Sequence, residues 1–318
     1  SHSHFTKDIR NTTRIASSPV NHFQGRTRAY LKVQDGCDNF CSYCIVPHTR
    51  GNSRSIPIKA VLDQASTYIS NGHKELVITG IHVGNYGKDL NEGYNITLLI
   101  EKLCSLFPDT HFRLSSIEPN EVDVELLKIM NENENFMSHL HIPLQSGCNK
   151  ILKKMGRNYS TETFSRMIEL CHAHVNDICI GLDTLVGFPG EDDSCFSSAK
   201  DFISKLDFTY LHVFPYSKRP GTEAAAYPNQ VNGEAKTHRV AVLRELSRKK
   251  SSFFYEKFIG TIRPVLIETT KDKEGKLKGF TDNYIPVLMK GSDDSLNTIQ
   301  HVMLSEKREN QVFGEIVS

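Results

Sequence analysis

Three cysteines, Cys37, Cys41 and Cys44, follow one another with three and then two residues between them. Three thiolates on one short loop can hold three irons of a cubane iron–sulfur cluster and leave the fourth iron without a protein ligand. An open iron suits a cluster that must bind a substrate or a cofactor directly, whereas clusters that only carry electrons usually have a fourth ligand. The spacing therefore predicts a catalytic 4Fe–4S cluster bound by these three cysteines.

Two other interpretations of the three cysteines stay open. A structural zinc ion would need a fourth Cys or His ligand, for which His48 is the candidate. The thiols could instead be unligated core residues. The chain has eight cysteines, and no signal peptide opens the sequence, which argues against disulfides. The other five cysteines are predicted to be buried, inert thiols: Cys104, Cys148, Cys171, Cys179 and Cys195.

Alternating strands and helices are expected to position this loop. A short strand over 30–33 runs into the cysteines, and strand-like and helical segments then alternate as far as residue 214. Such alternation indicates a parallel sheet of βα units, here about six, which is too few for a closed eight-unit barrel. We therefore expect an α/β fold with a partial (β/α)6 barrel and a site at the carboxyl ends of its strands. The predicted strands cover 30–33, 75–79, 111–115, 139–142, 177–186 and 210–214, and the predicted helices 58–70, 96–107, 121–131, 161–174 and 192–206.

The period of the sequence changes near its end. Helical spacing runs from 234 to about 258, and the apolar pattern then shifts toward a period of two. Short strands separated by Gly and Asp turns predict a small antiparallel β-barrel, with strands over 264–268, 277–281, 285–289 and 311–316. The predicted organisation is a lead-in segment over 1–25, a large domain over 26–232, a connecting helix over 233–252 and the barrel domain over 253–318.

The composition is that of an ordinary globular chain. Hydrophobic residues make up 38% and charged residues 24%, and no stretch approaches the roughly 20 apolar residues that cross a bilayer. No membrane partner and a cytoplasmic location are expected. The net charge is only +1, but residues 1–60 hold nine Lys or Arg against three Asp. This excess, and a second basic run over 244–250, could contact phosphates, although a solvated surface explains either run equally well.

The strand and the cysteine loop together resemble the radical S-adenosylmethionine (SAM) superfamily, in which an aromatic residue, here Tyr43, precedes the last cysteine. Further motifs resemble the methylthiotransferases of this superfamily and cover most of 28–222. They are VQDGC (33–37), PHTRG (47–51), SSIEP (115–119), HIPLQSG (141–147), GFPGE (187–191) and FPYS (214–217). The segment TGIHVGNYG (79–87) most resembles the branch that acts on N6-threonylcarbamoyladenosine in tRNA.

The resemblance implies a chemistry and its partners. The open iron would bind the methionine part of SAM, and reductive cleavage would give a 5′-deoxyadenosyl radical that takes the hydrogen at C2 of the modified adenosine beside the anticodon. Tyr43 is implied to flank the adenine of SAM, and the turn at Gly80 to lie near its amine. The final barrel resembles the RNA-binding TRAM domain, so tRNA is the implied partner, with a flavodoxin or ferredoxin as electron donor. Nine Lys or Arg against ten Asp or Glu over 251–318 argue against strong nonspecific RNA binding by this domain alone.

Several single residues are further candidates for the site. Glu118 and Gln145 stand at predicted strand ends, where they could bind the ribose hydroxyls or methionine head of SAM or only make core hydrogen bonds. Asp183, inside a predicted strand, could face the cavity as a cofactor ligand or pair with an arginine. Substrate contacts have simpler alternatives, a surface arginine or a loop histidine with ordinary hydrogen bonds. The candidates for such contacts are Arg50, His82 and Tyr216.

One departure from the methylthiotransferases concerns a second cluster. The family carries an N-terminal domain with three further cysteines that bind it, and those ligands are absent here because no cysteine precedes Cys37. The given chain is therefore expected to cleave SAM without completing sulfur insertion by itself. Two rival functions stay open. One is methylthiolation of a ribosomal protein side chain or of isopentenyladenosine in tRNA, and the other is a noncatalytic RNA-binding module with a structural metal.

Overall fold

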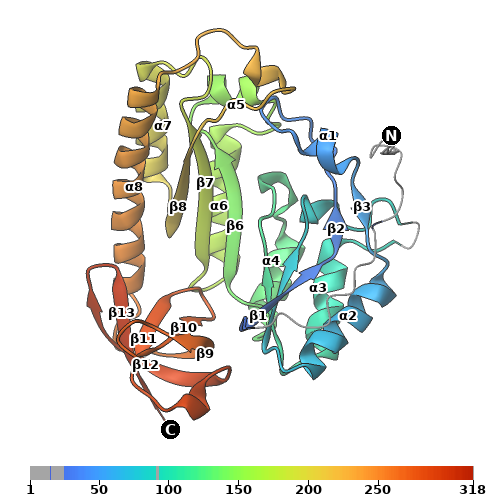
Figure 1. The fold of residues 1–318 in the computed structure, drawn as a ribbon, viewed down its shortest axis with the longest axis vertical. Coiled ribbons are helices and arrows are strands. Elements are labelled where there is room, and N and C mark those ends of the chain that lie inside the picture. The colour runs from blue at the N-terminus through green and yellow to red at the C-terminus, as the bar shows by residue number, and fades with distance from the viewer. Residues whose placement is uncertain (1–14, 16–24, 91–92, 318) are drawn as a thin grey trace, which may run out of the picture.

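Six parallel strands form an open barrel, and a long helix connects it to a closed five-stranded barrel (Figure 1). The computed structural model describes residue 15 and residues 25–90 and 93–317, so nearly all of the predicted lead-in over 1–25 lies outside the described residues. The open barrel consists of two three-stranded sheets with the orders β1-β4-β5 and β6-β7-β8, in which every neighbouring pair is parallel. The predicted six-stranded α/β architecture is confirmed.

The helices and strands of the open barrel alternate along the chain as predicted. The six strands are β1 (Arg28–Lys32), β4 (Glu75–Thr79), β5 (His111–Leu114), β6 (His139–Gln145), β7 (Cys179–Val186) and β8 (Tyr210–Pro215). The helices on its outside are α2 (Ile58–Ser70), α3 (Ile96–Leu106), α4 (Val124–Glu132), α6 (Thr161–His174) and α7 (Asp193–Lys205). Shorter elements are β2 (Gln34–Asp35), α1 (Val46–Arg50), β3 (Arg54–Ser55), α5 (Asn149–Met155) and the 3-10 turns η2 (Val83–Asn85), η3 (Pro119–Glu121) and η4 (Glu223–Ala225).

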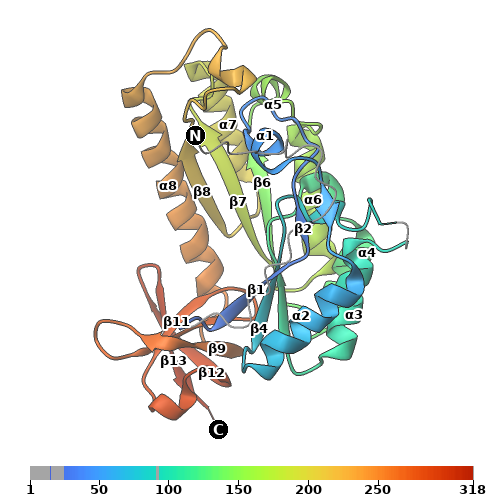
Figure 2. The same cartoon turned by 45° about the vertical axis from the view of Figure 1, so that its right-hand side comes forward.

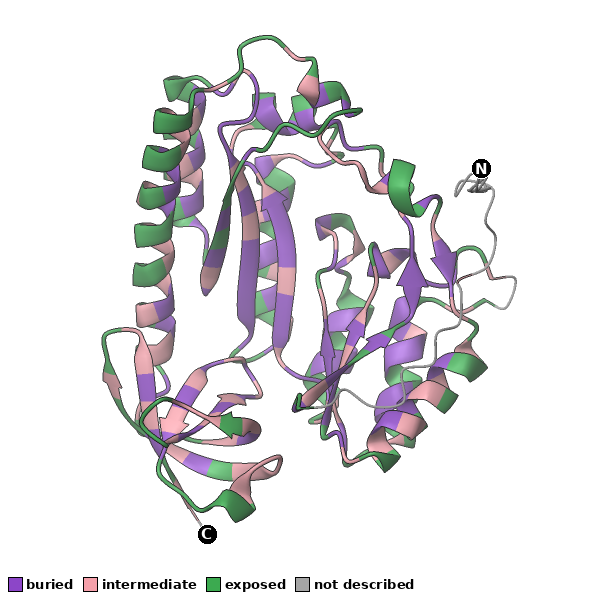
Figure 3. Ribbon diagram, viewed as in Figure 1, coloured by how far each residue is buried: buried purple, intermediate pink, exposed green. Residues whose placement is uncertain are grey.

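Local sequence explains where the outer helices begin. A short polar side chain precedes each of four helices and accepts a hydrogen bond from a backbone N–H in the first turn, which would otherwise lack a partner. The strands between these helices are buried along most of their length (Figure 3), because helices cover one face and other groups of the barrel cover the other. The four capping residues are Asn95, Asp123, Ser160 and Asp192.

The two sheets meet along one seam, between β5 and β6. Isolated bridges join Phe112 to Phe136 and Ser116 to His141, and the N–H of Ile117 donates to the carbonyl of His141 at 2.9 Å. The outer strands of the barrel are β1 and β8, and the long helix α8 (Gly233–Glu256) packs along β8 (Figure 2). The barrel is therefore open between β1 and β8, as six strands require.

The C-terminal strands form a closed barrel in the order β10-β11-β13-β12-β9. The predicted small barrel is confirmed, and its strands pair in antiparallel fashion except for β11 and β13, which pair in parallel. The chain places β12, which the sequence pattern did not reveal, between β11 and β13, and so β13 returns in the direction of β11. The elements are β9 (Ile262–Lys271), β10 (Leu277–Thr281), β11 (Pro286–Met289), η5 (Asp293–Ser295), β12 (Ile299–Arg308) and β13 (Gln311–Ile316).

The two ends of the open barrel differ in what lies against them. The loops that follow the strands, with α1 and α5, lie at one end, which we call the mouth, and the five-stranded barrel lies at the opposite end, the base (Figure 1). At the base, Arg113 of β5 donates to the carbonyls of Thr281 and Asp282, and Arg263 donates to Asp177 before β7 at 2.8 Å. Across the described residues, no helix is both long and apolar enough to span a membrane.

Candidate active site

A hairpin holds the cysteine loop at the mouth, directly after β1. Strands β2 and β3 pair on either side of the loop, and the N–H of Cys37 donates to the carbonyl of Gly51 at 3.1 Å. Gly36 has a φ of 78°, and a Cβ at this position would lie 2.0 Å from the carbonyl oxygen of Asn52. Only glycine fits both this backbone conformation and this close approach, so the VQDGC motif requires its fourth residue for steric reasons.

The loop also reaches across the mouth to the second sheet. The N–H of Ser42 donates to the carbonyl of Met155 at 3.0 Å, and its hydroxyl donates to the carbonyl of Lys154 at 2.8 Å. The carbonyl of Ser42 accepts from the N–H of Ala224, beyond β8. Cys41 is buried and Cys37 and Cys44 are partly exposed, and all three are free thiols. The cysteines therefore lie on a loop that is fastened to both halves of the barrel.

An arginine from beyond α5 contacts the middle cysteine. Arg157 places Nη1 3.3 Å from Cys41 Sγ, donates through Nη2 to Glu118, and donates through Nε to the hydroxyl of Tyr159 at 3.1 Å. Tyr159 in turn donates to the carbonyl of Pro143 at 2.8 Å. Burial raises the pKa of Glu118 above its ordinary value, although the nearby Arg157 opposes this shift. A fixed positive charge thus stands beside a sulfur that must be anionic when it binds a metal.

A histidine contacts the first cysteine from the loop after β4. His82 Nδ1 lies 3.6 Å from Cys37 Sγ, and Nε2 lies 2.7 Å from Glu121 Oε1. Burial disfavours the charged ring, but hydrogen bonds to Cys37 and Glu121 outweigh it and raise the pKa of His82 to about 9. His82 is buried, and its backbone N–H donates to Gln34 Oε1 at 2.8 Å. The structure thus pairs His82 with the cysteine loop and with Glu121.

A cavity of about 330 Å³ lies beside these groups. Its lining includes Cys41, His82, Glu118, Glu121 and Arg157. A cavity of this size can hold a portion of a small-molecule ligand. The lining is polar and carries both signs of charge, which suits a ligand with its own amino and carboxylate groups.

Three buried polar atoms of residues at the strand ends lack a hydrogen-bond partner among the described residues: Ser115 Oγ after β5, Gln145 Oε1 at the end of β6 and the hydroxyl of Tyr216 after β8. Gln145 also has a φ of 62°, a left-handed conformation that is uncommon for a residue other than glycine. Buried polar groups without partners are rare, and strained residues gather at ligand sites. Both features fit a strand end built to receive a ligand.

The remaining sequence-predicted residues take varied places. Tyr43 packs edge-on against Phe188, with ring centroids 6.3 Å apart. A Cβ on Gly80 would lie 2.8 Å from Gln34 Oε1, the atom that accepts from His82. Arg50 is exposed at the end of α1. Tyr216 is buried, with its ring 5.4 Å from that of Phe188.

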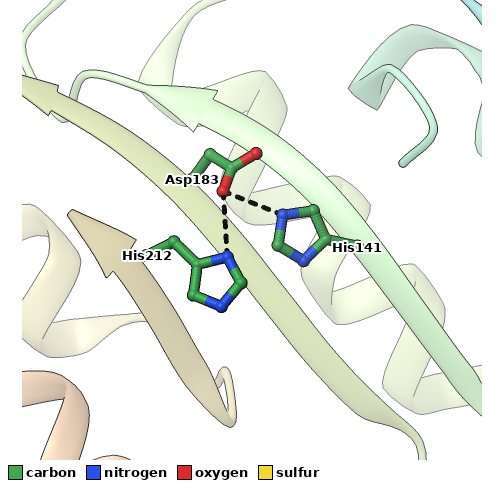
Figure 4. A group of neighbouring side chains, drawn as sticks. All are labelled: His141, Asp183 and His212. Carbon is green, nitrogen blue, oxygen red and sulfur yellow. Dashed lines mark ion pairs between the residues drawn. The ribbon is translucent and has the colours of Figure 1, made fainter. Parts of the chain in front are cut away.

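Asp183 lies apart from the cysteine loop, on the inner face of the second sheet. Its Oδ1 is 2.9 Å from His141 Nε2 and 3.4 Å from His212 Nδ1 (Figure 4). Burial opposes its ionisation, but hydrogen bonds from the two histidines lower the pKa of Asp183 to about 2. From the sequence, Asp183 is expected to face the cavity or to pair with an arginine; it lies on the inner face of the sheet, and its partners are two histidines.

The fold and the loop define an open parallel α/β barrel that carries three free thiols on one loop at its mouth. Residues 31–203 match the radical SAM superfamily. The chain belongs to this superfamily.

Comparison with curated proteins identifies relatives of this chain within the superfamily. The chain is 38% identical over 286 residues to the threonylcarbamoyladenosine tRNA methylthiotransferase MtaB of Bacillus subtilis, covering 89% of this chain and 63% of that protein. It is 34% identical over 291 residues to the tRNA-2-methylthio-N(6)-dimethylallyladenosine synthase of Fusobacterium nucleatum, covering 91% of this chain and 67% of that protein. The chain thus spans about two thirds of the length of these relatives.

A solved structure shows the same fold at low identity. The radical S-adenosylmethionine methyltransferase TsrM from Kitasatospora setae, determined with cobalamin and a 4Fe–4S cluster, aligns with a TM-score of 0.51 at 18% identity. The alignment covers 62% of this chain and 38% of that one. This likeness supports the barrel architecture.

The residues present fit the cluster and the cofactor that the superfamily uses. Three free thiols on one loop are the donor set of an open cubane cluster. The adjacent polar cavity and the partnerless Gln145 oxygen fit a small polar cofactor. Sequence reasoning missed Arg157, which contacts Cys41, and Glu121, which contacts His82, because only the fold brings these residues together. The segment after α5 contains no recognisable motif, so Arg157 is identified only by its contacts with Cys41 and Glu118 in the folded protein.

Proposed function

We propose that this chain is the radical and RNA-binding part of a tRNA methylthiotransferase acting at C2 of N6-threonylcarbamoyladenosine beside the anticodon. The observation that carries the proposal is the loop with three free cysteines over a polar cavity at the mouth of the barrel. The extensive similarity to a relative that carries this activity in its name supports the choice of substrate.

The residues at the mouth have separate roles in this proposal. Cys37, Cys41 and Cys44 would hold a 4Fe–4S cluster, which together with bound SAM supplies a radical able to take hydrogen from an unreactive carbon. Arg157 neutralises charge beside Cys41 and orients Glu118 at the edge of the cavity. The loop follows β1 of the first sheet, and Ser42 fastens it to the half of the barrel that contains the second sheet, which keeps these groups in place and helps to exclude water from the site.

We assign residues 26–232 to the radical domain, 233–252 to a connecting helix and 253–318 to an RNA-binding domain like TRAM. Exposed basic residues of α8 support an RNA contact, although Arg248 and Lys249 share the carboxylate of Glu245. Lys250 donates to the carbonyl of Leu206 and is already engaged within the protein. A one-electron donor such as a flavodoxin or a ferredoxin would supply the reducing equivalent.

The test uses hydrogen transfer, which precedes sulfur insertion and does not depend on a second cluster. The chain is reconstituted anaerobically with iron and sulfide, reduced with dithionite, and given SAM with tRNA that carries deuterium at C2 of N6-threonylcarbamoyladenosine. The expected product is 5′-deoxyadenosine containing deuterium, detected by mass spectrometry.

Matched substrates separate the rival functions. Deuterium transfer from isopentenyladenosine tRNA alone would assign the chain to the other tRNA branch, and turnover only with a ribosomal protein would assign it to the protein-modifying branch. A fully loaded cluster that yields no 5′-deoxyadenosine with any substrate would contradict the proposal and favour a noncatalytic RNA-binding protein.

A further inference from the structure

A second group of ligand-type side chains lies inside the open barrel, away from the cysteines. His141, Asp183 and His212 come from the adjacent strands β6, β7 and β8 (Figure 4). Their neighbours in sequence, such as Leu182 and Val213, belong to the core beneath the outer helices. Because side chains alternate along a strand, the three polar side chains share the opposite face and point into the barrel.

The geometry of the three side chains is that of metal ligands. Asp183 Oδ1 lies 2.9 Å from His141 Nε2 and 3.4 Å from His212 Nδ1, and all three ligand atoms lie within 4.8 Å of one another. Ligands bonded to one zinc-like ion at about 2.1 Å are about 3.0 Å apart at a right angle and about 3.4 Å apart at a tetrahedral angle. The two distances from Asp183 already match these values. The separation of the two imidazole nitrogens is at most 4.8 Å, and rotation of the side chains would bring it to the same range.

A hydrogen bond to the far side of His141 orients it toward this point. His141 Nδ1 lies 3.1 Å from the hydroxyl of Tyr210, which also lies 2.8 Å from Nε2 of the buried His139. Histidines that bind metals usually have the other ring nitrogen fixed by such a partner. The Tyr210 contact leaves Nε2 as the nitrogen that His141 presents to Asp183.

The third ligand leaves room for further donors. The side chain of His212 is 56% exposed, although the strand that carries it is packed against α8. An ion held by these three residues would therefore keep positions open toward the interior of the barrel. Structural sites are usually closed by four protein ligands, whereas open positions accept water or another molecule.

We propose that His141, Asp183 and His212 form a site for a borderline divalent transition ion, of the class of Zn²⁺ and Fe²⁺, separate from the cysteine loop. Two imidazole nitrogens and one carboxylate oxygen suit these ions better than Mg²⁺ or Ca²⁺, which prefer oxygen ligands throughout. The open positions take an oxygen or nitrogen donor of a molecule inside the barrel. The site does not depend on the proposed function.

Zinc binding to the cluster-loaded chain tests the proposal. The cysteines are first occupied by anaerobic reconstitution, Zn²⁺ is added, unbound metal is removed by gel filtration, and the metal is counted by mass spectrometry. The expected result is about one zinc per chain, with affinity reduced by roughly tenfold or more in His212→Ala and in Asp183→Asn. The matched control is His172→Ala, which removes a histidine 3.6 Å from a single carboxylate oxygen of Asp207 and should leave zinc binding unchanged.

X-ray absorption at the zinc edge identifies the ligands independently of stability. Only nitrogen and oxygen neighbours are expected, because the proposed site contains no sulfur and the cluster holds the three cysteines of the loop. Sulfur neighbours would assign the zinc to cysteines and overturn the proposal. Equal zinc affinity in the wild type and His212→Ala, or no zinc retained by the wild type, would also overturn it and leave Asp183 as a hydrogen-bonding partner of two histidines.

Discussion

The mouth and the base of the open barrel are built from the same six strands but satisfy their polar groups differently. At the base, buried Glu75 accepts from Arg28 at 2.7 Å and from Arg113 at 3.0 Å, and its side chain is 1% exposed. The two guanidinium groups also lie over the rings of Phe280 and Tyr284 of the small barrel. At the mouth, by contrast, the loop with three free thiols borders a polar cavity, and residues at the strand ends carry oxygens without a hydrogen-bond partner.

The difference teaches how one barrel separates stability from chemistry. Charges at the base are paired and buried, so removing one of them leaves another charge without compensation. Groups at the mouth have unused binding capacity, which costs stability in the free protein and becomes useful only when a ligand arrives. Substitutions at the base should therefore change stability, whereas substitutions at the mouth should change function.

The largest effect is expected from Cys41→Ser at the mouth. Loss of one of three thiolates should prevent stable cluster assembly, so 5′-deoxyadenosine should fall to the level of cluster-free protein while the fold is retained. Cluster absorbance and product assay measure both effects. Cys148→Ser, which removes a partly exposed thiol outside the loop, is the matched control and should keep the cluster. A Cys41→Ser variant with normal cluster content would refute the assignment of this ligand.

The next effect is expected from Arg113→Met at the base. This change leaves Glu75 buried with only Arg28 as a charged partner, so the free energy of unfolding should fall by about 1.5–3 kcal/mol. Urea unfolding measures the loss. Lys128→Met, which removes an exposed partner of Glu132, should change stability by less than about 0.5 kcal/mol. A similarly small loss in both variants would show that the base does not depend on its buried pairs.

Low pH should lower the stability of the protein through Glu75, at the base of the open barrel. Burial alone would favour the neutral carboxyl, but Arg113 and Arg28 lower its pKa from 4.5 to about 2. Its stabilising contribution is therefore complete above about pH 4.5 and is lost as the pH falls from there toward about 2. Unfolding curves at several pH values should show a shallower acid dependence in Glu75→Gln than in the wild type. The exposed Glu132→Gln should retain the wild-type slope, and equal slopes in all three proteins would exclude Glu75 as the source.

The smallest effect is expected from Gln145→Gly. This variant separates the backbone role of Gln145 from binding of SAM by its side chain. Glycine relieves the left-handed backbone at φ 62°, so the free energy of unfolding should rise by about 1 kcal/mol. If the partnerless Gln145 oxygen binds SAM, the KM for SAM should rise in the same variant. Asn229→Gly relaxes a similar φ of 58° at an exposed site and should leave the KM unchanged. An unchanged KM in both variants would limit Gln145 to a backbone role.

Local patterns predicted much of the fold. Helices α2 and α6 and strands β4, β10 and β13 lie at the predicted bounds, because each has a clear apolar period between turn or capping residues. The sequence did not reveal β12, whose exposed charged residues break the period-two pattern, or α5, whose Lys-rich turn is only seven residues long. The parallel pairing of β11 and β13 also depends on β12 and could not be inferred without it.

The site was predictable where its residues are adjacent in sequence and not where the fold brings them together. The cysteine loop is a local motif, so composition and spacing were sufficient to identify it. Arg157 meets Cys41 across 116 positions of sequence. The cluster of His141, Asp183 and His212 depends on the register of three parallel strands, which a single sequence does not specify.

The small barrel contacts both sheets of the open barrel: it accepts hydrogen bonds from Arg113 on β5, and its own Arg263 on β9 donates to Asp177, just before β7. The two sheets share few hydrogen bonds at their seam. The contacts with the small barrel therefore also help to fix the angle between the sheets. If a ligand of the small barrel binds better at one such angle, then a molecule held between the sheets at that angle strengthens its binding by the same factor. Under the proposed function, RNA binding by the small barrel and binding of one base of that RNA inside the open barrel would then be coupled, and either binding event would report the coupling.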